Sequence, residues 1–213
     1  ELARAIFGAD PLDRGEIFVH HKKVTIKNPS DSIKAGIAYL SEDRKLNGIA
    51  VRMCIRENIT MAAMDKVSSN LGLISKDAEV AAANTFVDKM EIKTPTVEQL
   101  VNNLSGGNQQ KVVIGKWLFR DATVMIFDEP TRGIDVGAKY AIYQLLDELA
   151  ANGVGVIVIS SELPEVLGVS DRVIVMREGQ MTGMLETKKT NQEEIMQYAT
   201  GVKNMFAKEY EVM

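Results

Sequence analysis

The stretch Val124-Met125-Ile126-Phe127-Asp128-Glu129 decides the fold class, because a continuous apolar run ends there in two adjacent carboxylates. Consecutive apolar residues without polar alternation are typical of a strand buried on both faces, as the central strands of a parallel sheet are. The run Val156–Ile159 has the same pattern, and Gly36–Leu40 and Arg172–Met176 are two further predicted strands. Longer amphipathic stretches separate these runs, which predicts an α/β domain with a mostly parallel sheet.

Two other segments depart from this pattern. Glu16–Val19 and Val24–Ile26 flank a polar turn and predict a solvated antiparallel hairpin at an edge of the fold. Between Ile55 and Val101 the strand signal disappears, and Lys76–Met90 favours a helix with Ser75 as its N-cap. We therefore expect a small helical lobe inserted between strands of the larger lobe.

The two ends of the chain also have distinct patterns. Glu1–Phe7 is predicted to be a helix that stops at Gly8, although a domain of this kind should open on a strand. We therefore expect the chain to begin part-way through a longer fold. A last helix is predicted near Asn191–Ala199, and a polar tail follows Gly201.

Composition narrows the possible classes of protein. The 213 residues carry 25 Lys and Arg against 29 Asp and Glu, and 46% of them are hydrophobic, which excludes a disordered or fibrous chain. No apolar run is long enough to span a bilayer, and no signal peptide is recognisable. The single cysteine, Cys54, excludes an internal disulfide framework and fits a reducing compartment. The acidic balance disfavours nucleic acid as a partner.

A hydroxyl and two glycines precede a predicted helix over Asn108–Phe119, in the sequence Leu104-Ser105-Gly106-Gly107. The N-terminus of a helix presents unpaired N–H groups and the positive end of the helix dipole, which suit a phosphate group. An ordinary helix N-cap at Ser105 is the alternative, because serine is favoured at that position in any case.

Asp128 and Glu129 lie where ligands bind in parallel α/β folds, at the carboxyl end of a predicted strand. In nucleoside triphosphatases with this layout, the first acid holds Mg²⁺ and an acid in the second position can polarise the attacking water. The alternative is that both carboxylates merely end the strand and cap the next turn.

Four motifs in this order resemble those of ATP-binding cassette (ABC) ATPases: SEDRK (41–45), LSGGNQQK (104–111), DEPTRGID (128–135) and SSELPE (160–165). The combination is similar to the second, C-terminal cassette of ATPases that energise ribose-, galactose- or xylose-type sugar importers. The resemblance implies a P-loop NTPase (RecA-like) core with an antiparallel edge and an inserted helical lobe. It divides the chain into a core lobe (1–50 and 106–200), a helical signature lobe (51–105) and a polar tail (201–213).

The resemblance also implies a site that uses ATP and Mg²⁺. Each ATP of a cassette dimer lies between the phosphate loop of one cassette and the signature of the other. The implied catalytic residues are Glu129, Asp128 and Ser161, and the implied metal ligands are Asp128 and Glu42. The implied nucleotide-binding residues are Ser105, Gly106, Gly107, Asn108, Gln109, Asp135 and Glu42.

Three features depart from the family pattern. No phosphate-binding loop of the type G-x-x-x-x-G-K-[ST] occurs, so we expect the chain by itself to bind ATP poorly. Glu42 replaces the usual glutamine, and Ser161 replaces the usual histidine. A carboxylate can still bind a hard cation, whereas a serine hydroxyl reaches less far than an imidazole and cannot become a cation. The alternative is that Glu42 is an ordinary loop residue and Ser161 is an ordinary N-cap.

The expected partners follow from the same resemblance. They are the N-terminal cassette of the same polypeptide or a second ATPase subunit, transmembrane permease subunits and, indirectly, a periplasmic or extracellular sugar-binding protein. We expect a peripheral position on the cytoplasmic face of the inner membrane. The segment around Met53, Ile55, Met61 and Met64 has two possible roles. It borders the groove that receives the permease, because methionine suits adaptable contacts, or it fills the core.

Three other classes of protein share parts of this pattern. Chromosome-maintenance and repair ATPases carry a very long coiled coil, whereas the insert between Glu42 and Leu104 is short and lacks sustained heptads. ABC proteins that act on ribosomes should carry a basic linker or tail, which is not present here. A regulatory or interaction module is the third alternative. The sequence does not identify the sugar.

Overall fold

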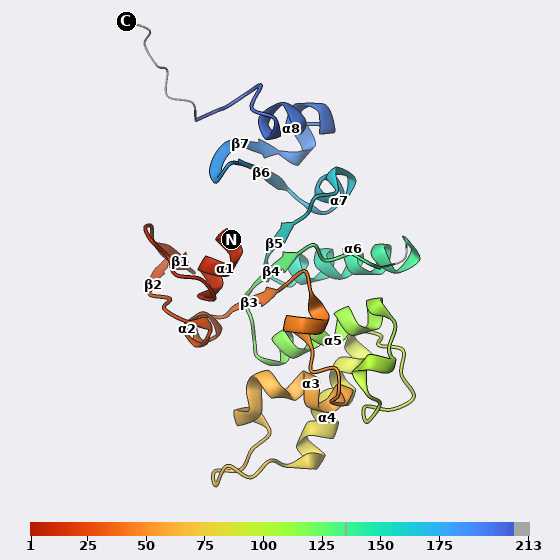
Figure 1. The fold of residues 1–213 in the computed structure, drawn as a ribbon. Coiled ribbons are helices and arrows are strands. Elements are labelled where there is room, and N and C mark those ends of the chain that lie inside the picture. Colours follow the sequence, from red (N-terminus) through yellow and green to blue (C-terminus); the bar gives the residue numbers. More distant parts are fainter. Residues whose placement is uncertain (135, 207–213) are drawn as a thin grey trace, which may run out of the picture. The chain divides into compact units, whose positions relative to one another are not determined.

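Three parallel strands form the central sheet: β3 (Ile37–Leu40), β4 (Val124–Asp128) and β5 (Gly155–Ile159) (Figure 1). This computed structural model describes residues 1–134 and 136–206. Strand β4 lies between the other two, and its inner residues are almost fully buried. The predicted central strand that ends in Asp128 is therefore confirmed, as is the parallel sheet.

The prediction that Val156–Ile159 is buried on both faces is wrong. In β5, Ile157 and Ile159 are 44% and 40% exposed, and exposure alternates along the strand. Among the described residues, β5 pairs with β4 alone. A strand on the edge of a sheet can keep apolar residues on a face that no described element covers.

The described residues form two compact units, Glu1–Ile159 and a second unit that begins at Ser160. The second unit contains α7 (Leu163–Val169), β6 (Arg172–Arg177), β7 (Gln180–Glu186), η4 (Thr187–Lys189) and α8 (Gln192–Ala199). Strands β6 and β7 pair antiparallel, and α8 packs on them through Ile195 and Tyr198. Asn191 accepts a hydrogen bond from the N–H of Glu194, so the predicted last helix is confirmed.

The predicted hairpin is also confirmed. β1 (Ile17–Val19) pairs antiparallel with β2 (Lys22–Val24), which begins two residues earlier than expected. His20 and His21 form the turn with φ angles of 49° and 62°, the left-handed conformation that two-residue hairpin turns require. The side chain of Val19 joins a small core with Ala3, Ile37 and Ile126.

The first helix ends as the sequence predicts. α1 (Leu2–Phe7) stops at Gly8, which has a φ of 76° and donates to the carbonyl of Ala5. A Cβ atom at Gly8 would lie 2.7 Å from the backbone of Asn28, so the position has room only for glycine. Asn28 in turn caps α2 (Pro29–Lys34) by accepting from the N–H of Asp31.

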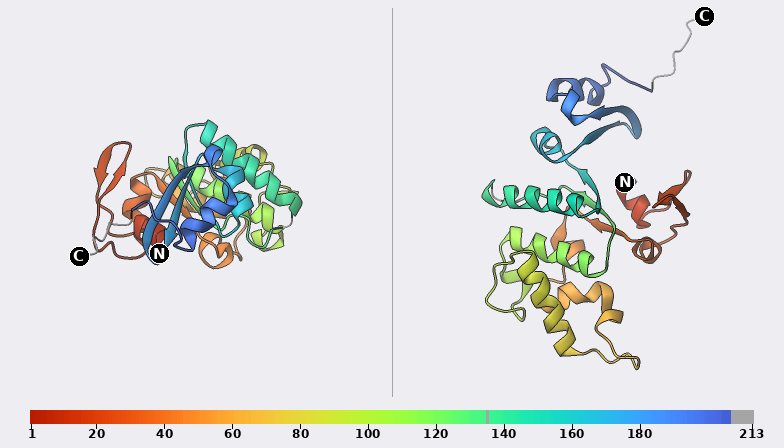
Figure 2. Two further views of the ribbon diagram at one scale, coloured as in Figure 1. Left: turned by 90° about the horizontal axis from the view of Figure 1, so that it is seen from above. Right: turned by 180° about the vertical axis from the view of Figure 1, so that it is seen from behind.

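The chain between β3 and β4 is helical, as the sequence predicts for the helical lobe, and its helices α3 (Ile55–Thr60) and α4 (Lys76–Lys89) lie at the bottom of Figure 1 and of the right-hand view of Figure 2. Ser75 accepts a hydrogen bond from Ala78 N at 3.3 Å, which confirms the predicted N-cap of the helix over Lys76–Lys89. The elements are η1 (Arg44–Gly48), α3 (Ile55–Thr60), η2 (Met61–Lys66), α4 (Lys76–Lys89), η3 (Val101–Asn103) and α5 (Gly106–Phe119); α6 (Val136–Ala151) follows β4.

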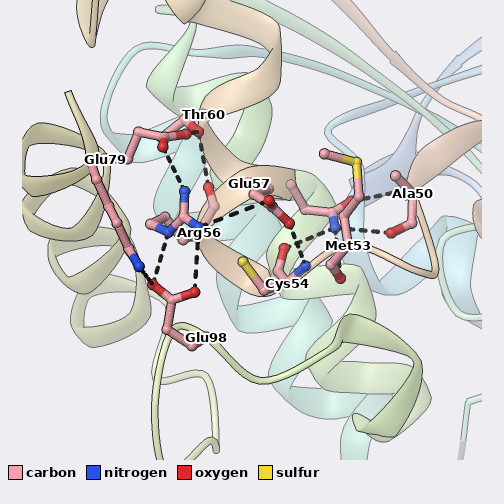
Figure 3. Close-up of polar contacts among 10 residues, drawn as sticks. Ala50, Met53, Cys54, Arg56, Glu57, Thr60, Glu79 and Glu98 are labelled. Atoms are coloured by element: carbon pink, nitrogen blue, oxygen red, sulfur yellow. Dashed lines mark hydrogen bonds and ion pairs between the residues drawn. The ribbon is translucent and has the colours of Figure 1, made fainter. Parts of the chain in front are cut away.

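A cluster of charges with a buried pair at its centre links the helices of this lobe (Figure 3). Arg56 on α3 donates to Glu79 on α4 at 2.5 Å and makes two further hydrogen bonds to Glu98, at 3.0 and 3.3 Å. Thr60 donates to the second oxygen of Glu79 at 2.7 Å. Ile55 is fully buried, so the core alternative holds for this residue of the apolar segment. No helix in the described part of the chain could cross a membrane.

Candidate functional site

The two acidic residues at the end of β4 lie at the carboxyl edge of the sheet, as predicted. Asp128 Oδ2 accepts a hydrogen bond from the hydroxyl of Tyr39 on β3 at 2.7 Å. Burial first, and then this hydrogen bond, raise the pKa of Tyr39 well above its usual range. The hydroxyl is protonated at neutral pH, as a tyrosine hydroxyl ordinarily is, and its hydrogen bond orients the carboxylate of Asp128. Sequence reasoning missed Tyr39.

Glu129 occupies an unusual backbone conformation. Its φ is 48°, in the left-handed region that non-glycine residues seldom adopt, and its N–H donates to the carbonyl of Ile159 on β5 at 2.8 Å. Its own carbonyl accepts from the N–H of Arg132 at 3.1 Å. Such strain is found at sites where surrounding contacts hold a residue in place for a function. Glu129 is therefore held firmly between the ends of two strands.

Glu42 follows β3 and forms an ion pair with Arg132, which lies in the turn after Glu129. With Asp43, Arg44 and Lys45, these two residues line a surface pocket of about 290 Å³. The structure thus brings the loop after β3 together with the loop after β4. Ser161 belongs to the second unit, and Asp135 lies outside the described residues.

The donor types in this region suit Mg²⁺. Asp128 and Glu42 offer the carboxylate oxygens that this ion prefers, and Mg²⁺ in such sites keeps several waters and bound phosphate oxygens as ligands. Within residues 1–134 and 136–206, no group of three or more His, Cys, Asp and Glu residues could hold a metal ion. Asp128 and Glu42 thus have the donor chemistry for an ion whose remaining ligands are water and phosphate oxygens.

The signature helix begins two residues earlier than predicted. α5 starts at Gly106, with Ser105 as the N-cap residue. The Ser105 hydroxyl makes no capping hydrogen bond to the backbone of α5, and it accepts a hydrogen bond from the side-chain nitrogen Nδ2 of Asn108 at 3.0 Å. Gln109 is buried and donates to the carbonyl of Val101 at 3.2 Å. Residues 105–107 therefore lie at the N-terminal end of α5, where backbone N–H groups have no partner within the helix.

Arg44 is a second residue that the sequence analysis missed. Its guanidinium donates to Gln109 Oε1 at 3.4 Å and to the carbonyl of Arg132 at 3.3 Å. A Cβ atom at Gly106 would lie 2.7 Å from Arg44 Nη2, so only glycine lets the cation lie so close to the start of α5. The motif SEDRK contains this arginine, but only the contacts across the fold reveal its position.

A sequence model of the family described as ABC transporter matches residues 1–132. The chain belongs to the ABC transporter family. The resemblance carried by the four motifs is thereby confirmed at the level of the family.

Relatives of this ABC protein are named as ribose/galactose/methyl galactoside import ATP-binding proteins. One from Agrobacterium fabrum and one from Burkholderia cenocepacia are each 58% identical over 201 residues. Each match covers 94% of this chain, and 40% and 39% of those proteins respectively. The chain therefore spans about 40% of the length of the curated relatives that it matches.

Solved ABC cassettes have the same fold. A nucleotide-free ATP-binding cassette matches with a TM-score of 0.74 at 22% identity, over 94% of this chain and 78% of that one. A dimeric cassette in a post-hydrolysis state bound to ADP and phosphate matches with a TM-score of 0.71 at 18% identity, over 89% and 80%. The predicted fold class, an ABC ATPase core with a parallel sheet and antiparallel strands, is confirmed.

Proposed function

We propose that this chain is the second, C-terminal cassette of an ATPase that couples ATP hydrolysis to the import of a monosaccharide. The observation that carries the proposal is the 58% identity, over 94% of the chain, to proteins named for ribose, galactose and methyl galactoside import. The strained Glu129 beside Asp128, at the edge of the sheet, supports a hydrolytic role.

The roles that we propose for the residues of this cassette's own ATP site rest on the hydrogen bond at Asp128 and on the family resemblance. Asp128, oriented by Tyr39, binds Mg²⁺ together with Glu42, and Glu129 polarises the attacking water. Mg²⁺, when bound, neutralises charge on the phosphates. On the family resemblance alone, Ser161 is the third residue proposed to take part in hydrolysis.

The signature has a different task. Ser105, Gly106 and Gly107 place backbone N–H groups and a helix N-terminus against the terminal phosphate of an ATP that the partner cassette holds. Asn108 orients the hydroxyl of Ser105 through its amide, and Asp135 carries signals across the interface.

The proposed assembly is the one that the family resemblance implies. The chain works with an N-terminal cassette or a second ATPase subunit, with permease subunits and indirectly with a sugar-binding protein, on the cytoplasmic face of the inner membrane. The proposed core comprises residues 1–50 and 106–200, and the tail comprises 201–213. The position of α3 and α4 supports 51–105 as the helical lobe.

The test compares two substitutions in the intact transporter, reconstituted in vesicles. Ser105→Arg places a long cationic side chain at the N-terminal end of α5, where the partner's ATP is proposed to bind. It should abolish ATP-driven sugar uptake. Glu129→Gln keeps the size of the side chain and should leave more uptake than Ser105→Arg, because the proposed signature serves the partner's ATP. The matched control, Ser30→Arg, changes an exposed serine near the start of α2 and should leave uptake intact. Equal or reversed effects of the first two variants would count against these roles.

A further inference from the structure

A lysine is buried on α5 in a place where charge is costly. Lys116 is 7% exposed, and its ammonium donates to the carbonyl oxygen of Gly48 at 2.5 Å. The same nitrogen lies 5.0 Å from the centre of the Trp117 ring. Among the residues that the structure describes, no carboxylate forms an ion pair with it.

Burial alone lowers the pKa of Lys116 to about 8. An ammonium group without a carboxylate partner is less favourable in the interior than an apolar side chain of similar length, such as methionine. Simple packing therefore does not account for a lysine at this position. Two contacts distinguish lysine from methionine here: the hydrogen bond to Gly48 and the approach of the ammonium to the Trp117 ring. Of the two, only the hydrogen bond reaches outside α5.

Gly48 is the last residue of η1, the short π-helical turn that follows Glu42. It is buried, and a Cβ atom on it would lie 3.3 Å from Val113 on α5, so the backbone of the turn is pressed against that helix. At the other end of the turn, Arg44 donates to Gln109. Gln109 and Lys116 are two helical turns apart, so α5 holds the turn at both ends.

We propose that Lys116 is a positioning residue that locks the turn Arg44–Gly48, and with it Glu42, to the signature helix. The inference rests on the proposed function for the roles of Glu42 and Ser105. In that scheme Glu42 serves this cassette's own ATP, whereas Ser105 at the start of α5 serves the ATP of the partner. The Lys116 contact therefore couples the two ATP sites by preventing the turn and the helix from moving independently.

The test uses Lys116→Met and Lys116→Arg in the intact protein, with hydrogen exchange as the first measurement. The amides of Asn47 and Ile49 donate to carbonyls within and just before the turn, so their exchange reports its order. Lys116→Met should speed their exchange about tenfold, the effect expected of one charge-assisted hydrogen bond. Exchange in α5 should stay unchanged, the melting temperature should stay equal or rise, and Lys116→Arg should restore slow exchange.

The second measurement is the dependence of ATPase rate on ATP concentration in the reconstituted transporter. Lys116→Met should lower kcat about tenfold with little change in KM, because the chemistry, and not the binding, requires both sites to align. The matched control is Lys66→Met. Lys66 also donates to a backbone carbonyl, that of Phe119 at 2.7 Å, but lies outside the turn, so this variant should leave the turn's exchange and kcat unchanged.

Two results would overturn the proposal. Unchanged exchange at Asn47 and Ile49 in Lys116→Met would show that the contact does not order the turn. Faster exchange throughout α5 with a lower melting temperature would assign Lys116 to general packing. If the unmodified transporter hydrolyses no ATP, the proposed function fails, and hydrogen exchange still decides whether Lys116 holds the turn.

Discussion

Replacing Arg56 alone should destabilise the protein far more than replacing Arg56 and Glu79 together. The two side chains are 9% and 8% exposed and are joined at 2.5 Å in the centre of the helical lobe (Figure 3). Arg56→Met leaves the carboxylate of Glu79 buried without its countercharge. Arg56→Met with Glu79→Leu replaces the whole pair by apolar side chains of similar size.

The expected magnitudes follow from the burial of both partners. Breaking a buried pair by removing one partner costs about 3–5 kcal/mol, whereas an apolar replacement of both is close to neutral. Glu98 remains partly exposed and can be solvated after Arg56 is lost, and the hydroxyl of Thr60 can still donate to the carbonyl of Arg56. We therefore expect the double variant to lose only about 1–2 kcal/mol and the coupling energy to be roughly 2–4 kcal/mol.

The assay is urea unfolding followed by the fluorescence of Trp117, the only tryptophan in the chain. The four proteins of the double-mutant cycle give the coupling energy directly. The exposed pair Arg4 and Asp10, joined at 2.7 Å in the same unit as Trp117, provides the matched control and should couple much more weakly. A loss below about 1 kcal/mol for Arg56→Met, or a coupling no larger than that of the control pair, would refute this account of the cluster.

Three further predictions test other contacts. Because the folded state lowers the pKa of Lys116 from 10.5 to about 8, it binds fewer protons than the unfolded state between these pH values. The free energy of unfolding should therefore rise with pH across that window, by up to about 3 kcal/mol, and urea titrations should show that Lys116→Met removes this rise. Gly36 has a φ of 82°, and an added Cβ would lie 2.8 Å from the Thr123 hydroxyl, whereas Gly153 in the same unit, with a φ of 84°, has open space. Gly36→Ala should cost at least about 1 kcal/mol more than Gly153→Ala in the same titrations, and equal costs would contradict the close approach. Tyr39→Phe removes the hydrogen bond to Asp128, so the Mg²⁺ concentration for half-maximal ATPase activity should rise roughly tenfold, and an unchanged Mg²⁺ dependence would exclude the orienting role.

Local features of the fold could be predicted from the sequence because they depend on neighbouring residues. The cap of α4 by Ser75, the stop of α1 at Gly8 and the strand that ends in Asp128 all follow from patterns within a few positions. The sequence pattern predicts a start of α5 two residues too late, because the two glycines there are poor helix formers and only the surrounding contacts hold them in the helix.

Parts of the candidate site could not be predicted in the same way. Tyr39 and Asp128 are 89 positions apart in the sequence, and Lys116 and Gly48 are 68 apart. No local pattern distinguishes a tyrosine that orients a carboxylate from one that only fills a strand. Likewise, the charge of Lys116 in an otherwise apolar helix face does not indicate whether it is solvated or buried.

The family, the order of the motifs and the residue types at the ends of the strands can be read from the sequence, because these are properties of short stretches of chain. The exposed face of β5, the approach of Arg44 to Gly106 and the burial of Lys116 and Arg56 appear only in the folded protein. Burial and pairing of this kind arise when distant segments pack together. The energy of a charged side chain depends on what surrounds it after folding, and the residues beside it in the sequence do not specify those surroundings.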